Sequence, residues 1–347
     1  MPRAASTNRT AISTSGGACD DRRMRNTRLG SFDGVSRLTL GGGGLGQVWG
    51  RSSDAEAVAA VRAALEAGIT FIDTAPMYRS CEAVIAAAFR GKLPADVRVT
   101  SKCQLGTVPS GTAGAALASS LDASLEAMQL DHVDVFFLHS NICEKDTEYA
   151  HGNDHRDMFA TTWSQYVEEV VPAFESLQRQ GRIGAWGITG IGMPTTIIKA
   201  LEHERRPAVV QVISNLLDSP GGLRRFSEPA RPREVIAAAT AHGVGVMGIR
   251  AVQAGALTAQ FDREVSASHP DGRDYLKAAP YRELCAELGV DPALLAHRYA
   301  LDMEGVDTVV LGVKNRVELA QCVEAESLGG LPPELRARID GLGLAAG

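Results

Sequence analysis

Phe71-Ile72-Asp73-Thr74-Ala75-Pro76-Met77-Tyr78 is the stretch of this chain that decides its fold. Its first residues, with Ile69 before them, make a short apolar, β-favouring run that is typical of a buried strand. The run ends at Asp73, and Tyr78 follows five residues later. Because a buried carboxylate is strongly destabilising without a cation beside it, Asp73 predicts a basic partner elsewhere in the chain.

Two further apolar runs supply that cation and another polar group. Residues 97–102 end at Lys102, and residues 133–138 lead directly into His139. Three successive strands are therefore expected to end in Asp73 with Tyr78, in Lys102 and in His139. In a parallel barrel, strand ends of this kind gather on one face, so the four side chains are predicted to form one site.

Strand and helix patterns alternate along most of the chain. The first strand is expected to end in the glycine run that begins at Gly41, and later strands are expected at 183–188, 208–213, 244–249 and 308–311. Helices are expected at 55–67 (with Asp54 as N-cap), 81–89, 112–128, 164–180, 194–203, 231–242, 280–288, 292–303 and 316–325. Eight strands each followed by helix predict an α/β protein, a parallel (β/α)8 TIM barrel in one domain, residues 26–347.

The N-terminal residues have a different composition. Residues 1–25 are mostly Ser, Thr, Ala, Gly, Asn and Arg, which predicts a disordered tail. Two hypotheses account for it: a start site upstream of a true start at Met24, or a basic transit peptide. After the tail, the Asp33-Gly34 step between two short runs predicts the turn of a β-hairpin.

Composition narrows the classes of function. The 347 residues are 45% hydrophobic and carry a net charge of −6, with no basic block that would indicate a nucleic-acid partner. No apolar run reaches the length of a membrane span. The six cysteines form no C-x-x-C pair and no secretory signal is evident, which predicts free thiols and a cytoplasmic location.

The set Asp73, Tyr78, Lys102 and His139 resembles the catalytic tetrad of the aldo-keto reductase superfamily in order, spacing and strand context. The resemblance extends from about residue 28 to about residue 324. It implies a (β/α)8 barrel whose bottom is closed by an N-terminal hairpin. It also implies an NAD(P)H-dependent oxidoreductase that reduces an aldehyde or ketone to an alcohol, or catalyses the reverse.

Under this resemblance each tetrad residue has a role. Tyr78 donates the proton, Lys102 lowers the pKa of the phenol and is itself held by Asp73, and His139 orients the substrate carbonyl. Two alternatives remain: a non-catalytic, nucleotide-sensing relative, and a lyase or isomerase that uses the same tetrad.

The resemblance also assigns cofactor contacts to segments that follow the strands. Thr189-Gly190 stands in place of the usual Ser-Asn, so Gly190 lacks the amide that would bind the nicotinamide carboxamide. The predicted cofactor-binding residues are Gly43, Thr189, Gly190, Gln211, Asn215, Arg250, Gly312, Lys314, Arg316 and Gln321.

Two of these segments leave the cofactor chemistry open. Arg250 takes the position of a usual Ser, where it meets either the pyrophosphate or a surface carboxylate. Lys314 and Arg316 precede a helix and suit the 2′-phosphate of NADP, whereas Glu318 opposes that phosphate. NADP is therefore the predicted cofactor, with NAD as the alternative.

Substrate recognition is predicted at Trp49, on the pocket wall, and at Trp163, in the 140–166 insertion after His139. The expected partner is a small carbonyl or alcohol, bound by a monomer or small homo-oligomer. The insertion also holds His151, Asp154, His155 and Asp157, but the Gly152-Asn153 step favours a loop, so no metal site is predicted. A lid over the substrate is the expected role of the insertion.

Overall fold

A closed barrel of parallel strands forms the centre of the computed structural model, which describes residues 24–149 and 152–345. In chain order its strands are β3 (Leu38–Gly41), β4 (Phe71–Asp73), β5 (Arg98–Cys103), β6 (Val133–Leu138), β9 (Ile183–Thr189), β10 (Val209–Ile213), β11 (Gly245–Ile249) and β12 (Thr308–Leu311). Each strand pairs with the next, and β12 pairs with β3 to close the ring. The (β/α)8 TIM-barrel prediction is confirmed.

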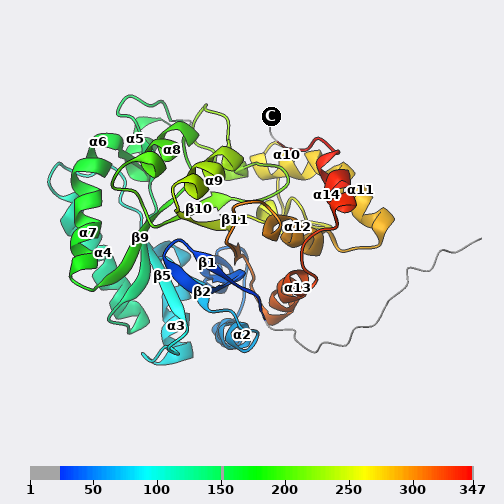
Figure 1. Cartoon of the computed structure of the whole chain (residues 1–347), viewed down its shortest axis with the longest axis horizontal. Coiled ribbons are helices and arrows are strands. Elements are labelled where there is room, and N and C mark those ends of the chain that lie inside the picture. The colour runs from blue at the N-terminus through cyan, green and yellow to red at the C-terminus, as the bar shows by residue number, and fades with distance from the viewer. Residues whose placement is uncertain (1–23, 150–151, 346–347) are drawn as a thin grey trace, which may run out of the picture.

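Helices surround this barrel (Figure 1). Those predicted from the sequence are α2 (Asp54–Glu66), α3 (Cys81–Phe89), α4 (Ala113–Met128), α7 (Val171–Arg179), α8 (Pro194–Glu202), α9 (Pro232–Ala241), α11 (Ala279–Leu288), α12 (Pro292–Leu301) and α13 (Arg316–Ser327). A short α6 (Trp163–Gln165) and a π-helical turn, Tyr166–Val170, run directly into α7. Helices not predicted are α1 (Gly42–Leu45), α5 (Asn153–Phe159), α10 (Pro270–Lys277) and α14 (Pro333–Asp340).

Capping explains where two of the site-bearing helices begin. Ser53, not Asp54, caps α2, because its hydroxyl accepts the Glu56 N–H at 3.1 Å and Asp54 is already the first helical residue. Asn315 caps α13 by accepting the Glu318 N–H at 2.9 Å, and Glu318 returns a contact by accepting the Lys314 N–H at 2.9 Å. This reciprocal arrangement resembles a capping box and folds Glu318 back over the helix start.

The N-terminal hairpin has a different turn from the one predicted. Strands β1 (Asn26–Leu29) and β2 (Phe32–Ser36) join through Gly30-Ser31, and Asp33-Gly34 lies inside β2. Between the Thr27↔Val35 and Leu29↔Phe32 pairs, β2 has one residue more than β1, and Gly34 has φ +68°. The Asp-Gly step therefore makes a β-bulge rather than the turn.

The hairpin closes the bottom of the barrel, as the resemblance implied. A Cβ at Gly30 would lie 2.5 Å from the Ala208 carbonyl oxygen and 3.2 Å from the Gly245 nitrogen, at the starting ends of β10 and β11. Leu29 and Val35 pack in one buried cluster with apolar side chains of the barrel strands: Phe71, Val135, Phe137, Val209 and Met247.

The glycine run after β3 is packed tightly against the chain's own backbone. A Cβ at Gly41 would lie 2.0 Å from the Leu311 carbonyl oxygen, and one at Gly44 would lie 2.1 Å from that of Val313. These glycines are required because strand ends and loops meet here without room for a side chain. The run forms the short helix α1 rather than an open loop.

The insertion after His139 has structure of its own. Strands β7 (Asn141–Cys143) and β8 (Ala160–Thr162) pair in parallel, and α5 lies between them. It packs on the loop after β5, where Thr107 N–H donates to the Asp157 carbonyl at 2.7 Å.

Of the predicted tail, residues 1–23 lie outside the described residues. Met24 and Arg25 contact the barrel: Met24 is buried against Gly68, and Arg25 Nε lies 2.6 Å from Glu326 Oε1. Among residues 24–149 and 152–345, no helix is long and apolar enough to cross a membrane.

Candidate active site

A buried ion pair forms the base of the site. Lys102 Nζ, on β5, lies 2.6 Å from Asp73 Oδ2, on β4, and also donates to the Thr74 carbonyl at 2.8 Å. The Lys102 side chain is 0% exposed and that of Asp73 is 3% exposed. Burial alone would lower the pKa of Lys102, but the adjacent Asp73 and Tyr78 outweigh it and raise that pKa. The ammonium therefore stays charged.

Two further residues hold the Asp73 carboxylate from other strands. Thr100 donates its hydroxyl to Asp73 Oδ1 at 2.8 Å, and Gln211 donates its side-chain amide to the same oxygen at 2.7 Å. Gln211 lies on β10, on the opposite side of the ring from β4. Thr100 was not predicted, although its position two residues before Lys102 places both side chains on one face of β5.

Tyr78 lies above this pair, in the 3-10 turn Pro76–Tyr78 that follows β4. Lys102 Nζ is 4.7 Å from the centre of its ring. Burial raises the pKa of Tyr78 above its ordinary value, and the Lys102 charge offsets this only in part. Lys102 thus lowers the pKa of the phenol as expected, but by less than burial raises it. The phenol keeps its proton and is able to donate it.

His139, directly after β6, completes the group. Its ring meets that of Tyr78 edge to face, with centroids 6.0 Å apart. Burial, and next the charge of Lys102, lower the pKa of His139 to about 3, so the imidazole is neutral at pH 7. Within the described residues its Nδ1 is buried without a hydrogen-bond partner. A buried polar atom of this kind favours a ligand that supplies the missing hydrogen bond.

The four predicted catalytic side chains thus lie together at the carboxyl ends of three neighbouring strands, β4, β5 and β6. Residues 37–343 match the family model described as "Aldo/keto reductase family". This chain belongs to the aldo/keto reductase family. Its relatives in this family include oxidoreductases, among them L-galactose dehydrogenase of Arabidopsis thaliana. The two sequences are 29% identical over 313 residues, which span 85% of this chain and 86% of that relative.

Two solved aldo-keto reductases share the fold. One is aldo-keto reductase AKR11C1 from Bacillus halodurans in its holo form, with a TM-score of 0.68, 23% identity, and coverage of 92% of this chain and 96% of that chain. The other is the glycerol dehydrogenase AKR11B4 from Gluconobacter oxydans, with a TM-score of 0.66, 19% identity, and coverage of 91% and 94%.

The predicted nicotinamide-side residues lie on the same face of the barrel as the tetrad. Thr189 is buried at the end of β9 and donates its hydroxyl to the Leu138 carbonyl at 3.3 Å. Gly190 N–H donates to the Gln211 carbonyl at 2.6 Å, and a Cβ at Gly190 would lie 2.8 Å from that oxygen. Lack of space for a side chain therefore accounts for the glycine at position 190.

Arg250 and Asn215 are held inside the loops that follow β10 and β11. Arg250 pairs with Asp271 at 2.8 Å, and its side chain is 11% exposed. Asn215 donates to the Arg250 carbonyl at 3.1 Å and accepts the Leu217 N–H at 3.0 Å. Arg250 thus forms an ion pair, as the second interpretation expected, although the pair is partly buried rather than on the surface. Its contact with a pyrophosphate stays a prediction.

A hollow between α2 and α13 contains the predicted adenosine-side residues. It is lined by Glu56, Asn315, Arg316, Val317, Ala320, Gln321 and Glu324. Arg316 donates to both carboxylate oxygens of Glu56, at 3.1 and 3.0 Å. Lys314 contacts Asp262 and, at 3.2 Å, Glu318. Glu56 and Asp262 were not predicted, because they are distant in sequence from the cations that they meet.

The two predicted substrate residues have different surroundings. Trp49 lies against Gly43, where a Cβ would be 2.6 Å from its indole nitrogen, and it is 39% exposed. Trp163 packs instead in the outer helical layer, 5.6 Å from the ring of Tyr166 and 6.0 Å from that of His203. Lys199 Nζ lies 4.0 Å over its indole. These contacts account for the position of Trp163 by packing, and its role in substrate recognition stays a prediction.

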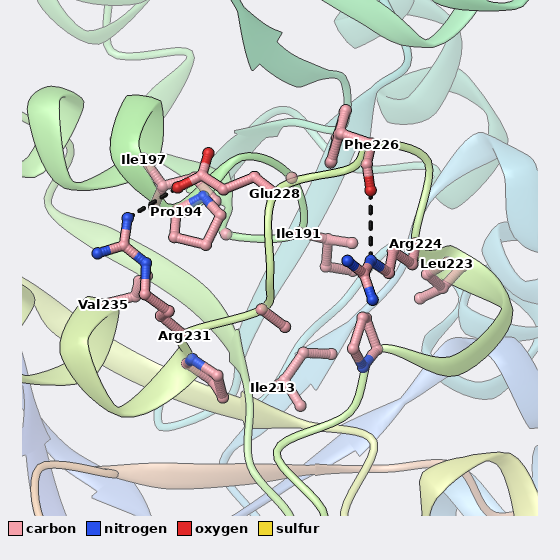
Figure 2. A pocket seen from close by; sticks show the side chains of 15 residues that line it. Ile191, Pro194, Ile197, Ile213, Leu223, Arg224, Phe226, Glu228, Arg231 and Val235 are labelled. Atoms are coloured by element: carbon pink, nitrogen blue, oxygen red, sulfur yellow. Dashed lines mark hydrogen bonds and ion pairs between the residues drawn. The ribbon is translucent and has the colours of Figure 1, made fainter. Parts of the chain in front are cut away.

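In the part of the chain that is described, no three His, Cys, Asp or Glu residues gather as metal ligands, and His151 lies outside it. A small cavity between α8 and α9 adjoins Gly190 (Figure 2). Its walls are mainly apolar, and its polar groups are paired internally, as in the 2.7 Å contact of Arg231 with Glu228.

Proposed function

We propose that this chain catalyses the reversible, NAD(P)H-dependent reduction of an aldehyde or ketone to an alcohol, with Tyr78 as the proton donor. The observation that carries the proposal is the buried Lys102–Asp73 pair beneath the Tyr78 ring. A buried charged pair contributes little to stability by itself, which favours a role in the chemistry at the phenol.

The roles of the residues follow from their charges and hydrogen bonds. Lys102 stabilises the negative charge that develops on Tyr78 as its proton leaves. Neutral His139 has a free ring nitrogen with which to position the substrate carbonyl beside the phenol. The nicotinamide, when bound, supplies the hydride. Asp73, Thr100 and Gln211 fix the position of the ammonium.

The arrangement of the α2–α13 hollow supports a dinucleotide, and its charges bear on which one. Lys314 and Arg316 are the cations suited to a 2′-phosphate, but Glu56, Asp262 and Glu318 already pair with them. A phosphate would have to displace carboxylates or lie beside them. We therefore propose that NADH binds at least as tightly as NADPH, which reverses the preference inferred from the two cations alone.

Loss of absorbance from reduced nicotinamide tests the proposal directly. Purified protein is mixed with NADH or NADPH and a panel of uncharged aldehydes and ketones. Turnover of at least one carbonyl, with alcohol formed in equal amount to the cofactor oxidised, is expected. Binding of cofactor without turnover of any carbonyl favours a nucleotide-sensing relative instead. A rearranged or cleaved product without cofactor oxidation favours a lyase or isomerase.

A further inference from the structure

We propose that Glu82, on α3, is a positioning residue: it fixes the start of α3, and with it Tyr78, relative to Lys102. This inference rests on the proposed reductase function and adds to it a residue that acts through Tyr78 rather than on the substrate. The observation that carries it is the hydrogen bond between Glu82 and Ser101, the residue before Lys102 on β5.

Glu82 is an acidic residue in a place where a carboxyl group is costly. It is 6% exposed, and its Oε1 accepts the Ser101 hydroxyl at 2.9 Å. Burial raises the pKa of the Glu82 carboxyl, and hydrogen bonds from Ser124 and Ser101 offset this only in part. Because an apolar side chain would fill the same space without that cost, the carboxyl is expected to have a specific task.

The hydrogen bond joins α3 to the strand that carries Lys102. Ser101 and Lys102 are consecutive on β5, so their side chains point to opposite faces of the strand. Lys102 points into the barrel and meets Asp73, whereas Ser101 points outward and meets Glu82 in the first turn of α3. One hydrogen bond therefore sets the distance between that turn and the backbone beside Lys102.

Tyr78 is joined to the same helical turn through a strained link. Two residues separate it from Cys81, where α3 begins, and the first of them is Arg79 with φ +50°. Residues with a side chain rarely adopt this conformation, and it persists only where the flanking structure holds it. The bond of Glu82 to β5 provides that support on the helical side.

The segment after β3 supports Tyr78 from the other direction. A Cβ at Gly46 would lie 1.7 Å from the Tyr78 carbonyl oxygen, so the two backbones are in close contact. The phenol ring, held between these supports, lies 4.7 Å from Lys102 Nζ. Loss of the Glu82 bond would remove one support, and the ring would then be free to move relative to the ammonium.

Ser124, on α4, provides a matched control. Its hydroxyl shares a hydrogen bond with that of Ser101 at 3.0 Å, and both residues are 0% exposed. Removing the Ser124 hydroxyl leaves the bond between Glu82 and Ser101 in place. A change at this position therefore reports the loss of a buried hydrogen bond that does not link α3 to β5.

Steady-state kinetics on variants of these residues tests the inference. Glu82→Ala and Ser101→Ala are expected to lower kcat by at least about 10-fold, with KM and cofactor affinity unchanged, because the phenol is displaced. Glu82→Gln keeps an oxygen that accepts from Ser101, so it is expected to keep the wild-type kcat, as is Ser124→Ala. Should Glu82→Ala fail to fold, Ser101→Ala, which removes a single hydroxyl, provides the comparison.

Ionisation of Tyr78 gives a readout that does not need turnover. The phenolate absorbance of each protein is titrated against that of the same protein carrying Tyr78→Phe, so that the difference reports Tyr78. The pKa of Tyr78 is expected to shift in Glu82→Ala and Ser101→Ala, because burial and the Lys102 charge both depend on where the ring lies. In Glu82→Gln and Ser124→Ala it is expected to keep its wild-type value.

The outcomes separate this inference from the proposed function. If the pKa of Tyr78 shifts as expected but wild type reduces no carbonyl, the proposed function is wrong and the positioning role is not. An unshifted pKa or a wild-type kcat in Ser101→Ala overturns the inference. A Glu82→Gln variant as impaired as Glu82→Ala also overturns it, because charge rather than the hydrogen bond would then matter. Equal losses in Ser124→Ala and Ser101→Ala overturn it in favour of packing alone.

Discussion

Lys102 is the residue on which the site depends. It is completely buried, and Asp73 is the carboxylate that balances its charge. Thr100 and Gln211 both donate hydrogen bonds to the Asp73 carboxylate. These bonds fix the position of the Asp73 side chain inside the barrel. Removing one member of a buried ion pair lowers the free energy of unfolding by more than the intact pair contributes to it, because the other charge remains desolvated.

Asp73→Asn is therefore expected to lower the free energy of unfolding by about 3–5 kcal/mol. The matched control is Glu287→Gln, which breaks an exposed ion pair with Arg338 and is expected to cost less than about 1 kcal/mol. Urea denaturation followed by circular dichroism measures both. Similar small losses for the two variants would show that the Lys102 charge has no need of Asp73.

Among single residues, the sequence alone was enough to predict the polar residues that end strands. The tetrad was predicted because a polar residue at the end of an apolar run is conspicuous. Glu56 and Asp262 were not predicted, since nothing local to either marks it as the partner of Arg316 or Lys314. Ion pairs between residues far apart in the chain are fixed only by the tertiary fold.

The elements above the barrel depend on close approaches of backbone. At Gly46 the segment after β3 meets the carbonyl of Tyr78, and any side chain there would displace the turn that holds the phenol. Gly114, on α4, offers a contrast: a Cβ there would make an ordinary 3.6 Å contact with Ala173.

Gly46→Ala is expected to lower kcat by at least about 10²-fold, the worth of a correctly placed acid, because Tyr78 moves. Gly114→Ala is expected to keep wild-type kcat and to stabilise the helix slightly, by about 0.5–1 kcal/mol. Steady-state kinetics with a reduced nicotinamide and an aldehyde that wild type reduces distinguishes them. Equal kcat values in the two variants would show that the contact at Gly46 is not needed to position Tyr78.

The contacts between α2 and α13 are proposed to determine the relative affinity for NADPH and NADH. Glu56→Gln removes the carboxylate that holds Arg316 and leaves the guanidinium free for a 2′-phosphate. The variant is expected to gain roughly tenfold in affinity for NADPH relative to NADH. Glu66→Gln, an exposed position at the end of the same helix, is the control. Fluorescence titration measures both ratios, and an unchanged ratio in Glu56→Gln would contradict the role of Glu56.

Elements with a clear period were predicted to within about two residues, and α3 and β6 matched at both ends. Helix α10 was missed because its large apolar residues, Tyr275 and Leu276, are adjacent and so do not recur at helical spacing. The hairpin turn was misplaced because Asp-Gly suits a bulge as well as a turn, and only the pairing of β1 with β2 distinguishes them.

Across the whole molecule, the residues that close the barrel and the residues proposed to carry out the chemistry lie at opposite ends. The hairpin and its apolar cluster close one end of the barrel, and the tetrad lies at the other, where the strands end. Changes at the closed end are expected to alter stability without altering catalysis.

Leu29→Ala tests this separation. Leu29 is completely buried in the bottom cluster, so the variant is expected to lose about 2–5 kcal/mol of unfolding free energy. Its kcat and KM at a temperature well below its melting point are expected to equal those of wild type. Leu328→Ala, at a residue 51% exposed, is the control and is expected to change neither quantity. A fall in kcat with Leu29→Ala would show that the two ends are coupled.

Replacement of the phenol itself tests the central claim most directly. Tyr78→Phe removes the hydroxyl and keeps the ring that contacts Lys102 and His139. Single-turnover oxidation of bound reduced nicotinamide by an aldehyde substrate is expected to slow by at least ~10²-fold, with cofactor affinity unchanged. A Tyr78→Phe variant that reduces the aldehyde at the wild-type rate would contradict the assignment of Tyr78 as the proton donor.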